Sequence, residues 1–368
     1  MLLTRVSFAN FRNITKEEIT FSPGINLICG DNAQGKTNIL EGIYYFSCLK
    51  SFRGVRDSDL IKDGETAASF QIAFSDEERN HENEIKLFKA KHKEMKKNGV
   101  RQKKASDMLG SFKCVIFAPE HLNLVKEGPT EKRRFMDAAL TQIKPGYLNA
   151  LVSYMKVLEQ KNILLKGIGK KPVLYETLAL WNEKLADYAL PLFEMRKEFL
   201  REIEQKARDV HKEISGGKEE ISLRYVPAKG GKKEDDEIPD RDAFLRHLNE
   251  NEQKEISLGF SLYGPHRDDF SAFLNGQNIK NHASQGQQRS AVLSLKSAEC
   301  ELFKELYGSY PLLLLDDILS ELDASRQKYI TENIEKYQVI LTCCEKDRFT
   351  NGENARVFSM ENGSVVKA

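Results

Sequence analysis

Gly30-Asp31-Asn32-Ala33-Gln34-Gly35-Lys36-Thr37 is the stretch that decides the fold, because it fits the Gly-x-x-x-x-Gly-Lys-[Ser/Thr] pattern of a phosphate-binding loop. The apolar run at residues 25–29 before it predicts a strand, and residues 37–46 after it predict a helix. Glycines let successive backbone N–H groups point at phosphate oxygens, and the start of the helix adds positive potential. We expect the whole stretch to bind a nucleotide, with Lys36 reaching its β- and γ-phosphates and Thr37 binding Mg²⁺. The alternative is a tight turn that needs only its glycines.

Two carboxylates end a second stretch, Leu312-Leu313-Leu314-Leu315-Asp316-Asp317, which predicts a buried strand. Carboxylates at the end of such a strand can bind the metal ion of a nucleotide site. We expect Asp316 to hold the Mg²⁺ shell, and Asp317 to accept a proton from the attacking water or to orient it. Lys36 and Asp317 are the expected catalytic residues. The alternative for residues 312–317 is a buried strand whose last Asp caps a helix. Because Lys36 and Asp316 lie 280 residues apart, the sequence predicts one core interrupted by an inserted lobe.

A third motif, Ala283-Ser284-Gln285-Gly286-Gln287-Gln288-Arg289-Ser290, opens a predicted amphipathic helix. It resembles the signature motif of ATP-binding-cassette ATPases, although it reads Ser-Gln-Gly-Gln-Gln where Ser-Gly-Gly-Gln is commoner. The resemblance implies that Ser284, Gly286 and Gln287 contact an ATP held by another subunit. It also implies that Asp323, in the D-loop stretch Ser320-Glu321-Leu322-Asp323, lies at the same interface of an ATP-dependent, head-to-tail homodimer. The alternative for this motif alone is an ordinary helix capped by Ser284.

Further stretches along nearly the whole chain resemble the RecF family of bacterial DNA replication and repair proteins, a chromosome-maintenance type of ATPase. They are Phe8-Ala9-Asn10-Phe11-Arg12-Asn13, Pro119-Glu120-His121-Leu122-Asn123-Leu124-Val125, Arg133-Arg134-Phe135-Met136-Asp137 and Tyr263-Gly264-Pro265-His266-Arg267-Asp268-Asp269. The resemblance implies ATP-gated DNA binding in recombinational repair and replication-fork maintenance, recombinase loading at gaps, the SOS response, and the partners RecR and RecO. It also implies that Arg12 touches nucleotide phosphates. Glu127 departs from the family pattern, which has glycine there.

The expected fold class is α/β: a P-loop core of the ATP-binding-cassette type, with mixed sheets and flanking helices, and an inserted, mainly helical lobe. We expect the core (lobe I) at residues 1–117 and 256–368, and lobe II at residues 118–255 with a mobile connector around 215–240. Apolar residues spaced by three and four predict the long helix of lobe II, which packs on a shorter stripe at residues 151–165. The long stripe is Leu178, Trp181, Leu185, Tyr188, Leu192, Met195 and Phe199.

The charge of the chain is unevenly distributed. The whole sequence carries a formal net charge of +1, but residues 84–104 hold nine Lys or Arg against two Glu. Asn98-Gly99 at their centre predicts a two-residue hairpin turn. A basic hairpin of this kind suits the DNA backbone, and Lys96, Lys97, Lys103 and Lys104 are the tentative DNA-binding residues. The alternative is a solvated edge hairpin whose lysines prevent aggregation.

Other function classes fit the sequence less well. No apolar run is long enough for a membrane span, and the N-terminus does not resemble a secretory signal, so we expect a cytoplasmic protein. The ATPase subunit of a membrane transporter is the main alternative, but it would normally carry a His shortly after the last core strand. A P-loop kinase needs neither the signature motif nor the D-loop. The expected activity is weak, DNA-stimulated ATP hydrolysis that acts as a molecular switch. The roles of residues 263–269 and of Arg133-Arg134 stay open.

Overall fold

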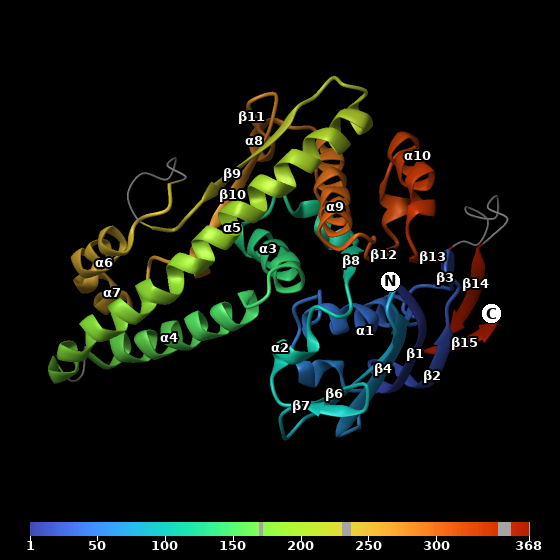
Figure 1. The fold of residues 1–368 in the computed structure, drawn as a ribbon, viewed down its shortest axis with the longest axis horizontal. Coiled ribbons are helices and arrows are strands. Elements are labelled where there is room, and N and C mark those ends of the chain that lie inside the picture. The colour runs from blue at the N-terminus through green and yellow to red at the C-terminus, as the bar shows by residue number, and fades with distance from the viewer. Residues whose placement is uncertain (169–171, 230–236, 345–354, 368) are drawn as a thin grey trace. The chain divides into compact units, whose positions relative to one another are not determined.

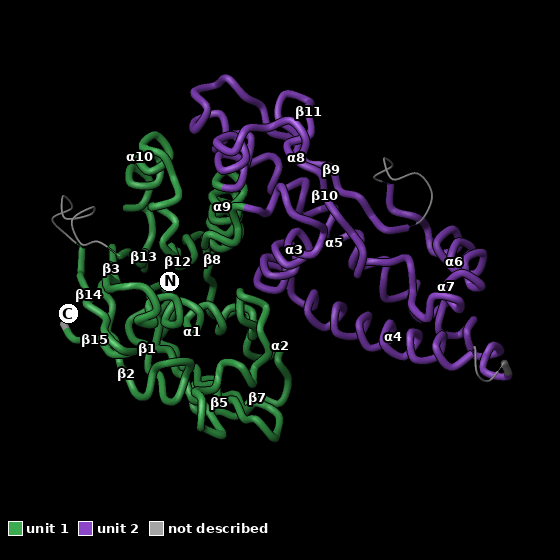
Figure 2. Tube along the Cα trace, turned by 180° about the vertical axis from the view of Figure 1, so that it is seen from behind, with its two compact units in different colours: residues 1–122, 293–368 green, residues 123–292 purple. Residues whose placement is uncertain are grey.

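The computed structural model describes residues 1–168, 172–229, 237–344 and 355–367 (Figure 1). The chain divides into two compact units: unit 1 is Met1–Leu122 with Leu293–Ala368, and unit 2 is Asn123–Val292 (Figure 2). This division places residues 256–292, which we expected in the core, in unit 2. The reason is that strand β10 (Asp269–Leu274) pairs with β9 (Ile221–Val226) and not with a strand of unit 1.

Unit 1 contains two six-stranded sheets. In the first, antiparallel sheet the strands lie in the order β2 (Ile14–Thr20), β1 (Leu2–Phe11), β4 (Ala67–Ser75), β5 (Asn80–Phe88), β6 (Glu94–Lys97) and β7 (Val100–Gln102). In the second, they lie in the order β15 (Ser364–Lys367), β14 (Arg356–Glu361), β3 (Ile25–Cys29), β13 (Val339–Cys343), β12 (Leu312–Asp316) and β8 (Cys114–Phe117). The predicted α/β core with mixed sheets is therefore confirmed.

The burial of the strands follows from what covers them. Buried residues alternate along β4 and β5, as expected for an antiparallel sheet with one wet face. Strands β8 and β13 are buried at every position, which is typical of the middle of a parallel sheet. Helix α1 (Lys36–Cys48) contacts β1 of the first sheet and β8, β12 and β13 of the second, so the phosphate-binding loop opens a helix in the centre of unit 1. The remaining helices of this unit are α2 (Ala105–Met108), α10 (Ala324–Asn333) and the C-terminal part of α9 (Gln285–Tyr307).

Unit 2 combines helices with a small antiparallel sheet. Its helices are α3 (Pro129–Ile143), α4 (Tyr147–Ile168), α5 (Leu178–Ser215), α6 (Arg241–Glu250), α7 (Glu252–Leu258) and α8 (Ile279–His282), and its strands lie in the order β11 (Gln277–Asn278), β10 and β9. The long helix α5 packs on α4, as the two apolar stripes predict. None of the described helices is long and apolar enough to cross a lipid bilayer.

Two expectations about unit 2 need correction. The connector expected around residues 215–240 includes β9, which is an ordered strand because it pairs with β10 over its whole length; residues 230–236 of that connector lie outside the described residues. Residue 256, where we expected the second part of the core to begin, lies within helix α7 of unit 2.

Candidate functional site

Two glycines give the phosphate-binding loop its shape. Gly35 has φ +109°, and a Cβ atom there would lie 2.6 Å from Oδ1 of Asn13. A Cβ atom on Gly30 would lie 2.4 Å from the carbonyl oxygen of Met360. A side chain at either position would therefore collide with its neighbours, and at Gly35 it would also strain the backbone.

Gln34 fixes the loop between two distant parts of unit 1. Its carbonyl oxygen accepts hydrogen bonds from Nδ2 of Asn13 at 3.1 Å and from the backbone N–H of Gly363 at 2.9 Å. Its side-chain Oε1 accepts a third from the backbone N–H of Asn362 at 2.5 Å. The turn between β14 and β15 thus holds the loop from one side and Asn13 holds it from the other, which preorganises the backbone around Lys36.

Lys36 is buried at the base of the loop, with 7% of its surface exposed. Its ammonium group donates to the carbonyl oxygens of Gly30 at 2.5 Å and Asp31 at 2.9 Å, and it lies 3.6 Å from Sγ of Cys344. The same thiol lies 3.1 Å from Oδ1 of Asn32. The charge of Lys36 therefore stays beside the backbone that is expected to surround the phosphates.

The two expected metal residues meet in the structure. The hydroxyl of Thr37, in the first turn of α1, donates to Oδ1 of Asp316 at 2.8 Å. Thr342, on the neighbouring strand β13, donates to the same oxygen at 2.8 Å and accepts from the backbone N–H of Asp317 at 2.9 Å. Thr342 was missed from the sequence, because nothing in its local pattern shows that β13 lies beside β12. Asp317 has a left-handed backbone, with φ +46°.

The surroundings of Asp316 act on its ionisation in opposite directions. Burial raises the pKa of this carboxyl above its ordinary value, while the hydrogen bonds from Thr37 and Thr342 and the charge of Arg53 lower it. The charge of Glu120 adds a further rise. The carboxyl group of Asp316 therefore lies beside the start of α1, with the hydroxyl groups of Thr37 and Thr342 as hydrogen-bond donors.

Arg12 and Arg53 converge on a carboxylate that sequence reasoning also missed. Arg12 Nε and Nη2 each donate to one oxygen of Glu41 at 2.8 Å, and Arg53 Nη1 lies 3.7 Å from Glu41 Oε2. Ser51 donates a further hydrogen bond to Glu41 Oε1. Glu41 lies four residues after Thr37 on α1, so the cluster belongs to the same helix as the phosphate-binding loop.

The signature-like motif begins α9 with a reciprocal cap. The backbone N–H of Gln287 donates to Oγ of Ser284 at 3.2 Å, and the backbone N–H of Ser284 donates to Oε1 of Gln287 at 2.8 Å. This is a capping box, so the hydrogen bonds of the ordinary helix cap are present. Ser284 is exposed and Gly286 is half-buried. In unit 1, Asp323 caps α10 through the backbone N–H of Arg326 at 3.1 Å.

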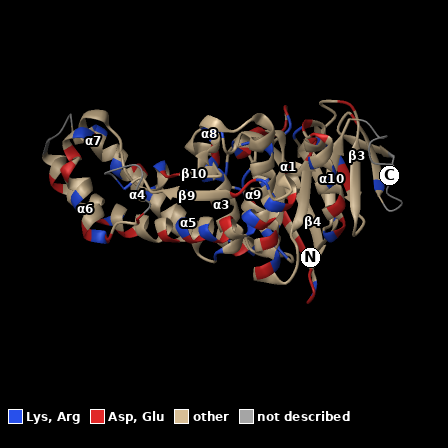
Figure 3. Ribbon diagram, turned by 90° about the horizontal axis from the view of Figure 1, so that it is seen from above, with Lys and Arg blue, Asp and Glu red and all other residues tan. Residues whose placement is uncertain are grey.

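The basic hairpin has the predicted turn but divides its lysines between two faces. Asn98 and Gly99 have φ +51° and +77°, as the Asn-Gly turn requires, and Lys97 pairs with Val100 across it. Lys96 lies on the face opposite the buried Met95 and forms a 2.8 Å ion pair with Glu84. Figure 3 shows acidic residues interspersed with basic ones along the ribbon.

Lys97, Lys103 and Lys104 differ from Lys96. Lys97 shares a sheet face with Met95, because residues two apart on a strand point the same way. Lys103 and Lys104 are exposed and follow the end of β7. Within the described part of the chain these three side chains have no ion pair, so their charge is the more available part of the hairpin.

The motif at residues 263–269 surrounds a buried charge network in unit 2. Arg196, 1% exposed, donates to Asp268 Oδ2 at 2.9 Å, to Asp137 Oδ1 at 2.7 Å and to the carbonyl of Pro265 at 2.5 Å. Arg133 donates to the carbonyl of Asp268 at 2.8 Å. These contacts give Asp268 and Arg133 a structural role inside the unit, since a buried arginine is stable only when its donors are satisfied.

His266 is held in the same region by two contacts. Its Nδ1 lies 2.5 Å from the hydroxyl of Tyr154, and its Nε2 lies 3.2 Å from the carbonyl oxygen of Ser261. Burial lowers the pKa of His266 to about 4. A neutral, hydrogen-bonded histidine of this kind is part of the fold. Arg134 instead pairs with Glu131 at 2.5 Å on its own helix.

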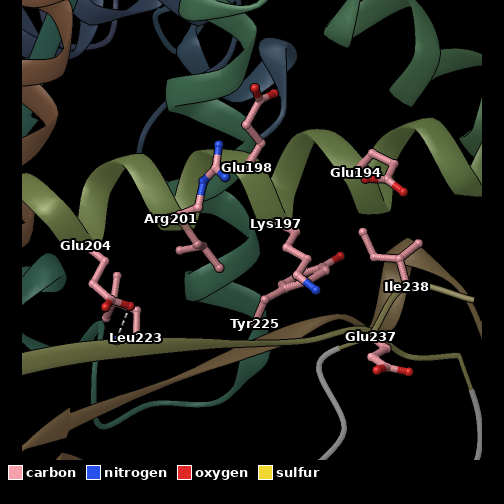
Figure 4. Close-up of a pocket in the computed structure, with 10 residues that line it drawn as sticks. Glu194, Lys197, Glu198, Arg201, Glu204, Leu223, Tyr225, Glu237 and Ile238 are labelled. Carbon is pink, nitrogen blue, oxygen red and sulfur yellow. Dashed lines mark hydrogen bonds between the residues drawn. The ribbon is translucent and has the colours of Figure 1, made fainter.

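A groove of about 860 Å³ lies in unit 2 between α5 and β9 (Figure 4). Most of its lining side chains are charged, with both signs represented. At one end of the groove, the carboxylate of Glu204 accepts a hydrogen bond from the backbone N–H of Leu223 at 2.9 Å. The groove contains none of the residues that the sequence singles out.

Comparisons with known proteins identify relatives that are similar to this chain over nearly its whole length. The sequence matches the family model described as RecF/RecN/SMC N terminal domain over residues 2–366. DNA replication and repair protein RecF of Ruminiclostridium cellulolyticum is 40% identical over 370 residues, and the match covers 99% of each chain. The protein of the same name from Lachnoclostridium phytofermentans is 38% identical over 369 residues and covers 100% of both chains.

One solved structure is similar over its whole length. It is described as the recombination mediator protein RecF-ATP in the RecFOR pathway, and it superposes with a TM-score of 0.91 at 34% identity. The match covers 100% of this chain and 97% of that one. The names of these relatives concern DNA repair and not membrane transport.

Proposed function

The chain belongs to the RecF family of DNA replication and repair proteins, and we propose on that basis that it is an ATP-dependent DNA-binding protein of recombinational repair and replication-fork maintenance. ATP closes a head-to-tail homodimer on DNA, and slow hydrolysis, stimulated by DNA, releases it. The partners are RecR and RecO, and the protein acts in the cytoplasm to support recombinase loading at gaps and the SOS response. Membership of this family sets the transporter alternative aside.

The observation that supports the proposal most strongly is the 2.8 Å contact between Thr37 and Asp316 beneath a glycine-shaped loop. A hydroxyl and a carboxylate are the hard oxygen ligands that Mg²⁺ prefers, and Mg²⁺ usually completes its shell with water and substrate phosphates. We propose that Thr37 and Asp316 hold Mg²⁺, which neutralises charge on the β- and γ-phosphates. The loop from Gly30 to Thr37 holds the phosphates through backbone N–H groups and Lys36, and Arg12 contributes a further charge.

The proposed dimer assigns the remaining site residues to the partner's nucleotide. Ser284, Gly286 and Gln287 of one subunit meet the γ-phosphate bound by the other, and Asp323 lies at the same interface. The exposed hydroxyl of Ser284 supports this assignment, because it accepts from Gln287 within its own subunit and keeps its proton free to donate to a phosphate oxygen.

A charge at position 284 tests this function. Aspartate is as good a helix cap as serine, so Ser284→Asp should preserve the start of α9 while it repels the partner's γ-phosphate. We expect the ATP-dependent dimer to dissociate at least about tenfold more readily than the wild-type dimer, since like charges brought together cost several kcal/mol. Analytical ultracentrifugation with and without ATP, in the presence of DNA, measures this.

The control is Ser257→Asp, which places the same charge on an exposed serine of α7 and should leave the dimer unchanged. A Ser284→Asp dimer as stable as the wild type would leave Ser284 with its capping role only. Wild-type protein that stays monomeric with ATP and does not bind DNA would refute the proposed function itself.

The basic hairpin is the proposed DNA contact, carried by Lys97, Lys103 and Lys104 with a smaller contribution from Lys96. Reversing the first three charges together should weaken DNA binding about tenfold or more and reduce the salt dependence of the affinity, because fewer counterions are released. Lys96→Glu alone should have a smaller effect, since Lys96 is already paired with Glu84. Fluorescence anisotropy with duplex DNA at several salt concentrations measures both effects. ATP affinity should not change in either variant, and equal effects of the two would contradict the division between the faces.

A further inference from the structure

Glu41 is the most completely buried charge near the phosphate-binding loop: its side chain is 0% exposed, whereas those of Arg12 and Arg53 are 19% and 32% exposed. A buried carboxylate is costly to keep unless its oxygens are satisfied. Here both oxygens are used, by the bidentate Arg12 contact, by the hydroxyl of Ser51 and by Arg53. The two arginine side chains, by contrast, remain partly exposed.

The backbone of Arg12 is held in an unusual conformation. Its φ is +54°, in the left-handed region that non-glycine residues rarely adopt. The backbone N–H of Arg12 donates to the carbonyl of Leu60 at 2.8 Å, and its Nη1 donates to the carbonyl of Asp59 at 3.0 Å. The backbone and the guanidinium group of Arg12 are therefore each held by hydrogen bonds of their own. Backbone strain of this kind persists where the surrounding structure fixes the direction of a side chain.

Arg53 extends the same chain of alternating charges toward the expected metal side. Its Nη1 donates to Oδ1 of Asn38 at 3.1 Å, and Asn38 in turn donates to Asn13, which holds the loop. Asn38 directly follows Thr37, one of the two expected metal residues, on α1. Glu41 is the only one of these groups that is fully buried and shared by both arginines.

We propose that Glu41 is the positioning residue of the nucleotide site: it orients the guanidinium groups of Arg12 and Arg53 for the charge that develops on the transferred phosphate. The proposal rests on the proposed ATPase function. Glu41 touches no phosphate in this scheme and acts only through the arginines.

Glu41→Gln separates orientation from charge. Glutamine removes a negative charge near the phosphates, which favours ATP binding, and frees the guanidinium groups to rotate, which disfavours it. These effects oppose each other, so we expect the dissociation constant for ATP to change by less than about threefold. Hydrolysis depends on orientation, and we expect kcat to fall at least about tenfold, since small misplacements of a positioned group cost up to ~10²-fold.

A multiple-mutant comparison shows whether Glu41 acts through the two arginines. Groups that work as a unit are not additive, so adding Glu41→Gln to the double variant Arg12→Ala with Arg53→Ala should leave its kcat unchanged within about twofold. The assays use the full-length chain, saturating Mg²⁺ and ATP, duplex DNA, and a fluorescent ATP analogue for affinity.

The matched control is Glu255→Gln in unit 2. Glu255 is also fully buried and pairs with Lys161 at 2.7 Å, and it contacts none of the residues of the nucleotide site. This variant should lower the melting temperature and leave kcat unchanged. Equal losses of kcat in both Gln variants, or a further loss of kcat when Glu41→Gln is added to the variant that lacks both arginines, would overturn the proposal. Failure of the wild type to bind ATP would refute the underlying function, which is a distinct outcome.

Discussion

Replacing Lys36 with alanine should weaken ATP binding at least about a hundredfold. Lys36 is 7% exposed and its ammonium group lies against the carbonyls of Gly30 and Asp31, so it is the one cation that the loop itself places inside the proposed phosphate site. Removing one partner of a buried, hydrogen-bonded charge pair costs about 2–5 kcal/mol, and each ~1.4 kcal/mol is a factor of ten. Titration with a fluorescent ATP analogue measures the loss.

The control for Lys36→Ala is Lys50→Ala, which removes an exposed lysine just after α1. We expect this variant to bind ATP like the wild type, and both variants should unfold cooperatively. If Lys36→Ala bound ATP within threefold of the wild type, the stretch from Gly30 to Thr37 would be a tight turn, and the proposed nucleotide site would be wrong.

Short motifs in this sequence predicted local structure well because each depends on few residues. The Gly-x-x-x-x-Gly-Lys-Thr stretch lies between β3 and α1 as expected, and the Asn98-Gly99 turn forms because both residues tolerate positive φ. Contacts between residues that are close in the chain can therefore be predicted from the local sequence.

In the predicted apolar stripe of the long helix, every second position was one residue out of register. Leu178, Leu185, Leu192 and Phe199 are buried as expected, but Tyr188 is 41% exposed. The positions buried between them are Asn182, Ala189 and Arg196. Helix α4 deviates in the opposite direction, since Met155 is 47% exposed whereas Tyr154 and Lys161 are fully buried. An apolar pattern overlooks charged core residues, because their burial depends on distant partners such as Asp268 and Glu255.

The missed site residues have a similar explanation. Glu41 appears in the sequence as an ordinary polar residue of a helix, and Thr342 as a residue of a buried strand. Each gains its role from a contact across the fold, to Arg12 and to Asp316 respectively. Such pairs cannot be predicted from the spacing of residues in the sequence until the order of the strands is known.

Asp317→Asn should reduce ATP hydrolysis by about a thousandfold while the ATP-dependent dimer persists. General base catalysis contributes ~10²–10⁴-fold, and asparagine has the same shape but cannot take the proton of the attacking water. The substitution should not disturb the backbone, because asparagine tolerates the left-handed conformation that Asp317 adopts at φ +46°. Single-turnover hydrolysis and ultracentrifugation with ATP measure the two effects, and Asp63→Asn, at an exposed turn, is the control.

The structure also indicates why Asp317, and not Asp316, is the expected base. Oδ1 of Asp316 already accepts from Thr37 and Thr342, and Asp316 is 5% exposed. Within the described residues the carboxylate of Asp317 accepts no hydrogen bond, while its backbone N–H is held by Thr342 at 2.9 Å. A fixed backbone with an uncommitted carboxylate suits a group that must bind a water molecule. Asp316→Asn should therefore weaken Mg²⁺-dependent ATP binding, whereas Asp317→Asn should preserve it, and rapid turnover by Asp317→Asn would remove this residue from catalysis.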